Sequence, residues 1–139
     1  PPASRSALSV HEVELETGVS VVSVHLAGTP EERLAQADSV TSFFASLDRP
    51  VVLAGDFNGR PGGPVLGRLE ESWRVLAKSG DPQTFPADAP DREIDFVLVS
   101  RSGSGARQIE VVEHRVINAP MAADHRPILA VLRVVPPRD

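Results

Sequence analysis

Polar side chains that can bind a cation or move a proton stand at the ends of apolar, strand-like segments of this sequence. Carboxylate oxygens are ligands that Mg²⁺ prefers, and imidazole transfers protons near neutral pH. If the last two of these strands run antiparallel to the first two, the side chains gather along one edge, where open α/β folds bind ligands. The residues concerned are His25, Asp56, Asn58, Asp95, Asp124 and His125.

Each of these residues also has a purely structural interpretation. The run Asp56 to Asn58 after a strand is typical of an Asx turn. His25 alone fits a half-buried strand end, and Asp124 alone fits a cap. Two other histidines, His11 and His114, fall in alternating segments and are assigned to the surface or to sheet faces. The joint pattern of the six residues, rather than any one of them, favours a site.

The first half of the chain predicts a strand, a strand, a helix and a strand. Residues 7–15 and 19–25 form a hairpin around a Gly turn. Thr29-Pro30 with Glu32 matches a capping box at a helix start, and an apolar face follows at Leu34, Ala37, Thr41, Phe44 and Leu47. Residues 51–54 then form a buried strand, parallel to the strand that ends at residue 25.

The second half predicts loops, a short helix and three more strands, which makes the class α/β with a mixed sheet. A short helix begins at Pro64 and ends near Leu69. The Pro- and Asp-rich stretch between Trp73 and Arg92 predicts a long surface loop, of the kind that is often functional. The remaining segments are a strand at 94–100, a Gly/Ser turn at 101–107, and strands at 109–117 and 128–135.

Length and composition exclude several classes of protein. The 139 residues predict one domain, and 41% hydrophobic with 24% charged residues is typical of a soluble globular chain. Cysteine is absent, so any metal must bind oxygen or imidazole. No apolar run approaches the ~20 residues of a membrane span, and no signal peptide is visible. The net charge of −5, with 13 scattered arginines and one lysine, does not indicate nucleic-acid binding.

Four motifs of the chain resemble, in order, those of the endonuclease/exonuclease/phosphatase superfamily. They lie at residues 21–26 (VVSVHL), 52–58 (VLAGDFN), 94–97 (IDFV) and 123–127 (ADHRP). This superfamily includes deoxyribonucleases, abasic-site endonucleases, sphingomyelinases and inositol-polyphosphate phosphatases. The resemblance implies a metal-dependent hydrolase of phosphoester bonds with Mg²⁺ or Mn²⁺. It also implies a fold of two packed mixed sheets flanked by helices, of which this chain resembles the C-terminal half.

Site roles follow from the resemblance, residue by residue. Asp56 would activate the attacking water, and Asn58 would hold that water or a phosphoryl oxygen. His125, oriented by Asp95, would stabilise the charge of the transition state. His25 would contact the phosphate or act as a general acid. Asp124, together with Asp56, would bind the metal.

The resemblance leaves the substrate and the partners open. The loop from Gly59 to Arg92 carries five acidic and five basic residues and so offers no basic surface for DNA. Its stretch from Thr84 to Asp91, with Asp95, resembles that of bacterial hydrolases of the superfamily, which favours a small-molecule or lipid head-group phosphoester over DNA or RNA. The second alternative is a non-catalytic half-domain that works only with a complementary N-terminal chain. Because residues 128–132 are apolar on both faces, we expect the missing half or a second copy to cover them. The compartment, bacterial cytoplasmic or secreted, is not predicted.

Overall fold

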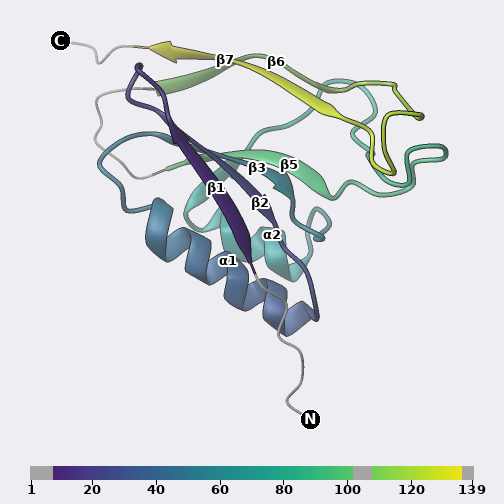
Figure 1. Cartoon of the computed structure of the whole chain (residues 1–139), viewed down its shortest axis with the longest axis horizontal. Coiled ribbons are helices and arrows are strands. Elements are labelled where there is room, and N and C mark those ends of the chain that lie inside the picture. Colours follow the sequence, from purple (N-terminus) through teal and green to yellow (C-terminus); the bar gives the residue numbers. More distant parts are fainter. Residues whose placement is uncertain (1–7, 102–107, 136–139) are drawn as a thin grey trace.

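The computed structural model describes residues 8–101 and 108–135 and consists of three layers (Figure 1). Helices α1 (Pro30–Phe44) and α2 (Pro64–Glu70) cover one face of a five-stranded sheet. A separate two-stranded sheet lies over the other face. The predicted α/β class with a mixed sheet is confirmed.

The five-stranded sheet has the order β1-β2-β3-β5-β4. β2 and β3 are parallel, because α1 connects them, and all other neighbours are antiparallel. The second sheet is an antiparallel pair with a register shift at Val111/Glu113. The strands are β1 (Ser9–Glu14), β2 (Ser20–His25), β3 (Val51–Asp56), β4 (Trp73–Val75), β5 (Asp95–Ser100), β6 (Gln108–Val116) and β7 (Ile128–Val135).

The start of α1 follows the predicted capping box. The Thr29 side chain accepts from the backbone N–H of Glu32, and the Glu32 carboxylate accepts from the backbone N–H of Thr29. These two bonds satisfy donors that the first helical turn leaves unpaired. Ala37 and Phe44 are buried on the predicted face, so α1 packs against the sheet by the periodicity that the sequence shows.

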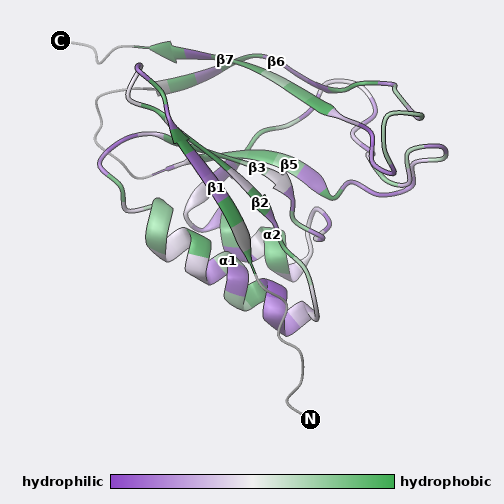
Figure 2. Cartoon of the chain, viewed as in Figure 1, coloured by the Kyte–Doolittle hydropathy of each residue, from purple (hydrophilic) through white to green (hydrophobic). Residues whose placement is uncertain are grey.

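Buried residues form two clusters, one on each face of the five-stranded sheet. The helix side holds the larger cluster, which includes Phe57, Trp73 and Phe96. Between the two sheets lies a smaller one that includes Val52, Val97 and Ile109. Figure 2 shows hydrophobic residues along the strands, while α1 alternates hydrophobic and hydrophilic residues. The sheet is therefore buried on both faces over its central strands.

The prediction of a surface loop from Trp73 to Arg92 is wrong in part. Residues 73–75 form β4, which pairs with β5 at the edge of the sheet. Trp73 and Thr84 are fully buried, and Leu76 and Ala87 are almost so. Clusters of Pro, Asp and Gly correctly predict turns here, but the turns carry inward-pointing side chains between them.

Two further predictions concern the turn after β5 and membrane-spanning segments. The Gly/Ser turn predicted at 101–107 falls mostly outside the described residues, which resume at 108. Within the described ranges, no helix is long and apolar enough to cross a membrane.

Gly55 lets β2 and β3 approach each other next to the strand ends that carry His25 and Asp56. Its φ of 143° lies in a region that side chains avoid. A Cβ atom at this position would sit 1.9 Å from the carbonyl oxygen of Val24. No flexible side chain could move away to relieve this contact, because the clashing atom belongs to the backbone.

We therefore expect Gly55→Ala to destabilise the fold by about 2 kcal/mol or more, as measured by urea unfolding. The matched control is Gly67→Ala in α2, where a Cβ would meet nothing within 4 Å. Since Ala favours helix over Gly by up to about 1 kcal/mol, the control should be neutral or stabilising. Equal unfolding midpoints for Gly55→Ala and the wild type would contradict this account.

Candidate active site

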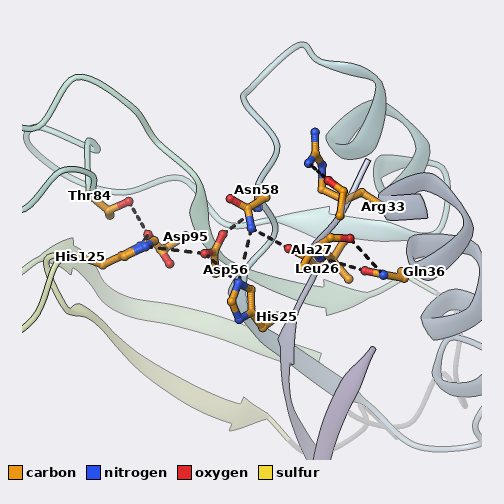
Figure 3. Close-up of polar contacts among 11 residues, drawn as sticks. His25, Leu26, Ala27, Arg33, Gln36, Asp56, Asn58, Thr84, Asp95 and His125 are labelled. Carbon is orange, nitrogen blue, oxygen red and sulfur yellow. Dashed lines mark hydrogen bonds and ion pairs between the residues drawn. The ribbon is translucent and has the colours of Figure 1, made fainter. Parts of the chain in front are cut away.

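Strand register places three of the six candidate residues in one row. Asp56, the last residue of β3, pairs with His25 of β2 on one side and with Asp95 of β5 on the other. Just beyond the row, the backbone N–H of Leu26 donates to the Asp56 carbonyl, and that of Phe57 donates to the Ile94 carbonyl. The row is thus part of a continuous hydrogen-bonded ladder, and its side chains lie close together (Figure 3).

His125 enters the site from the loop before β7 and pairs with Asp95. Its Nδ1 lies 2.8 Å from Oδ2 of Asp95, and its Nε2 lies 3.7 Å from Oδ2 of Asp56. The ring packs against Phe85, with centroids 4.7 Å apart. The predicted contact between Asp95 and His125 is therefore present, and the packed ring cannot easily turn away from it.

On the other side of Asp56 lie His25 and Asn58. Nε2 of His25, whose side chain is 63% exposed, is 3.4 Å from Oδ2 of Asp56. Asn58 has a φ of 45°, and its backbone N–H donates to Oδ1 of Asp56, which is the expected Asx turn. Nδ2 of Asn58 also donates to the Leu26 carbonyl at 2.6 Å and lies 3.5 Å from Nε2 of His25. The structural and the functional interpretation of this motif therefore coexist.

The turn after β2 is held by α1, which fixes where His25 lies. Gln36, buried on α1, accepts from the backbone N–H of Ala27 and donates to its carbonyl, at 3.0 and 3.1 Å. Arg33 donates to the Gly28 carbonyl at 2.6 Å. Helix packing and site geometry are thus coupled through a few backbone bonds (Figure 3).

Asp56 and His125 have shifted proton affinities. Burial raises the pKa of Asp56 above its ordinary value of 3.8, and the Asp95 charge adds to the rise, against the backbone N–H of Asn58 and the two histidines. Burial lowers the pKa of His125. The hydrogen bond and charge of Asp95, helped by the charges of Asp56 and Asp124, outweigh burial and raise this pKa above 6.5. A more basic carboxylate and a more persistent imidazolium therefore stand side by side.

Three of these residues could hold a metal ion. Asp56, Asp95 and His125 each offer one ligand atom, and these atoms lie within 4.8 Å of one another. Asp124 is exposed and is not part of this group, although its charge acts on His125. The donor set of carboxylate oxygens and imidazole fits a divalent cation. Asp124 as a metal ligand stays a prediction.

Two residues that support the site were missed at the sequence level. The Thr84 hydroxyl donates to Oδ2 of Asp95 at 2.5 Å, and Nζ of Lys78 donates to the Asp95 backbone carbonyl at 2.7 Å. The Lys78 side chain is fully buried and ion-paired with Glu93. Lys78 is the one lysine of the chain, a signal that sequence reasoning could have used. For Thr84 no comparable signal exists.

The two histidines assigned to other places differ from each other. His11 is exposed on β1. His114 lies on β6, as expected for a sheet-face residue, but it is only 3% exposed and its Nδ1 is 2.9 Å from the Leu129 carbonyl. Burial lowers the pKa of His114 below 6.5. Of these two histidines, only the exposed His11 is therefore suitable as a control position for substitution.

Comparison with known proteins decides the family. The family model described as "Endonuclease/Exonuclease/phosphatase family" matches residues 4–125. The chain belongs to this family. Among curated proteins, it is 27% identical over 150 residues to the RNA-directed DNA polymerase from the mobile element jockey of Drosophila melanogaster. This match covers 97% of the present chain and 16% of the polymerase.

Solved structures of the family share the fold with this member. A humanised TDP2 from D. rerio has a TM-score of 0.69 at 20% identity, over 91% of this chain and 60% of its own. The human nocturnin catalytic domain has a TM-score of 0.66 at 19% identity, and the match covers 91% of this chain and 52% of that domain. The mannosyl-6-phosphatase of Bacteroides thetaiotaomicron has a TM-score of 0.65 at 17% identity, and the match covers 85% of this chain and 53% of that protein. This family member thus spans little more than half of these chains.

The pairing of Asp95 with His125 can be tested by NMR titration. Asp95→Asn keeps an acceptor for the ring N–H but removes the charge, so we expect the pKa of His125 to fall. The matched control, Asp124→Asn, removes a charge that carries no hydrogen bond to the ring, and should lower the pKa less. An unchanged pKa in Asp95→Asn would contradict the assigned pairing.

The same shift predicts a pH dependence of stability. Because the folded-state pKa of His125 is raised, its contribution to stability is fully present below the unfolded value of about 6.5. That contribution is lost as the pH rises through the folded pKa. Asp95→Asn should therefore cost more unfolding free energy at pH 5.5 than at pH 8.5, as measured by urea unfolding at both pH values.

Proposed function

We propose that this chain carries the catalytic residues of a metal-dependent hydrolase of phosphoester bonds. The observation that carries the proposal is the row of His25, Asp56 and Asp95 at the strand ends, closed by His125 2.8 Å from Asp95. A base, an oriented imidazole and carboxylates that can bind a cation lie within a few ångströms of one another, which matches the needs of phosphoester hydrolysis.

Each residue has a role that its surroundings support. Asp56, whose pKa burial raises, takes the proton of the attacking water as its oxygen bonds to phosphorus. His125, whose pKa the hydrogen bond and charge of Asp95 raise against the effect of burial, stabilises the negative charge that builds on the phosphoryl oxygens. His25 contacts the phosphate or gives a proton to the leaving oxygen, and Asn58, anchored on Leu26, holds the water or a phosphoryl oxygen.

A divalent cation, Mg²⁺ or Mn²⁺, completes the proposed site. Asp56 and Asp124 would hold it, and when bound it would supply positive charge for the phosphate oxygens. The ion would also compete with protons for the Asp56 carboxylate, so its binding should weaken at acidic pH.

The favoured substrate class is a small-molecule or lipid head-group phosphoester. Residues 59–92, which include Thr84 and Phe85 next to Asp95 and His125, carry equal numbers of acidic and basic residues, which does not favour a nucleic-acid backbone. A structural relative, the mannosyl-6-phosphatase, is named for a sugar phosphate. The second candidate is a nuclease, which is favoured by the similarity of 97% of the chain to a polymerase named for nucleic acids.

In the intact protein, Asp56→Asn and His125→Ala should lower kcat for bis-p-nitrophenyl phosphate by about 10²- to 10⁴-fold with Mg²⁺ or Mn²⁺. Chelation with EDTA should abolish turnover and added Mn²⁺ should restore it. Matched controls are Asp48→Asn, an exposed carboxylate before the opposite end of β3, and His11→Ala, both expected to keep wild-type rates.

Near-wild-type kcat in either site variant would refute that residue's role. The absence of metal-dependent turnover in the intact wild type would refute the proposed activity itself. A supercoiled plasmid and a sugar phosphate, assayed in parallel under the same conditions, separate the nuclease from the favoured class. Cleavage of the plasmid alone would reverse that preference.

The proposal includes a covering polypeptide, because an apolar groove of about 510 Å³ separates the two sheets. Val21 and Leu15 line it and remain 36% and 43% exposed. Among the described residues, β7 has β6 as its one strand neighbour. Since the solved relatives contain nearly as much chain again, we assign the groove to a polypeptide of the complete domain that pairs with β7, rather than to a second copy.

The 139-residue chain by itself should therefore bind a hydrophobic dye and self-associate, as measured by light scattering after size exclusion. Val21→Asp should reduce dye binding, whereas Phe43→Asp, at an exposed apolar position on α1 away from the groove, should not. A cooperative 14.8 kDa monomer without dye binding would refute a docking surface. A discrete dimer that Val21→Asp dissociates would make the second copy the occupant.

A further inference from the structure

We propose that Thr84 is a positioning residue that acts on His125 through Asp95. Its hydroxyl donates to Oδ2 of Asp95 at 2.5 Å, and the same oxygen accepts from Nδ1 of His125 at 2.8 Å. Figure 3 shows the contacts of Thr84 and His125 meeting at the Asp95 carboxylate. This inference deepens the proposed function, since it names a residue that sets the geometry of the same site.

A carboxylate needs more than one partner to be fixed in orientation. The terminal torsion of Asp is broad, so a single hydrogen bond leaves the carboxylate plane free to pivot. Thr84 supplies a second donor to the oxygen that receives His125. Lys78 holds the other end of the residue, because its Nζ donates to the Asp95 backbone carbonyl at 2.7 Å. Asp95 is therefore clamped at its main chain and at its carboxylate.

Thr84 is itself held by both sides of the pair that it joins. Its backbone N–H donates to the Arg92 carbonyl, three residues before Asp95, at 2.8 Å. Its own carbonyl accepts from the backbone N–H of Arg126, next to His125, also at 2.8 Å. Any displacement of this segment would move the hydroxyl and the imidazole together. The backbone thus keeps the donor aligned with the dyad.

A purely structural role would not require this acceptor. Thr84 is fully buried, and a buried hydroxyl must be hydrogen-bonded, since leaving it unsatisfied costs about 1–3 kcal/mol. Most buried hydroxyls bond to backbone carbonyls or water. Here the acceptor is an ionisable carboxylate, and charge-assisted bonds are shorter and stronger than neutral ones. The bond therefore does more than satisfy a buried donor.

The test compares Thr84→Val, which removes the hydroxyl at nearly constant volume, with Thr84→Ser, which keeps it. In the intact protein labelled with ¹⁵N-histidine and without substrate, the Hδ1 resonance of His125 should move upfield and exchange faster with water in Thr84→Val. In Thr84→Ser it should keep its wild-type position. With bis-p-nitrophenyl phosphate, Thr84→Val should lower kcat about tenfold to hundredfold with little change in KM, and Thr84→Ser should restore it.

The matched control is Thr41→Val, because the Thr41 hydroxyl accepts from Nε1 of Trp73 at 3.0 Å on the helix side of the sheet. It should lower stability but leave the His125 resonance and kcat unchanged. An Hδ1 resonance that stays in place or moves downfield in a folded Thr84→Val variant would overturn the proposal. Because the resonance is measured without turnover, failure of the proposed hydrolase activity would be recognised separately.

Discussion

The site depends on the register of three strands, which puts His25, Asp56 and Asp95 side by side. A strand shifted by one residue presents its side chains on the opposite face, so a slip of β3 would separate Asp56 from both neighbours. The register is fixed partly by the close approach of β2 and β3 at Gly55, where the strands leave no room for a Cβ atom. Backbone packing one residue away therefore determines the chemistry of the row.

Burial and neighbouring charges shift the pKa values of Asp56 and His125. Burial raises the pKa of Asp56, and the nearby charge of Asp95 adds to the rise, against the backbone N–H of Asn58 and the two histidines. Asp95 itself accepts hydrogen bonds from Thr84 and His125. Burial lowers the pKa of His125, but the hydrogen bond and charge of Asp95, with the charges of Asp56 and Asp124, raise this pKa overall. Asp56 is thus more basic than an ordinary Asp, and His125 is protonated more readily than an ordinary His.

Local patterns predicted most of the elements and five residues that the structure brings together. These predictions rest on short-range signals in the sequence. The signals are the capping box at Thr29, the β-branched run of β2 and the order of the four motifs. The contributions of Thr84 and Lys78 could not be predicted, because they depend on how residues 73–92 fold back on β5. Turn-forming residues indicate where such a chain bends, but not which side chains it buries. The division into two sheets is expected from the family resemblance alone, because it depends on long-range packing that local patterns do not show.

The groove and the site are physically connected, because Gly55 and Asp95 line the groove at the end where the row lies. Water in the groove screens the charges of Asp95 and His125, whereas an apolar cover would lower the local dielectric and strengthen their attraction. A polypeptide that pairs with β7 would therefore change the site without touching substrate. It would also press β7, whose first residue follows His125 by three positions, against the sheet that carries Asp95. On the proposed arrangement, completion of the second sheet would reinforce a dyad that Asp95 and His125 already form, with Nδ1 2.8 Å from Oδ2.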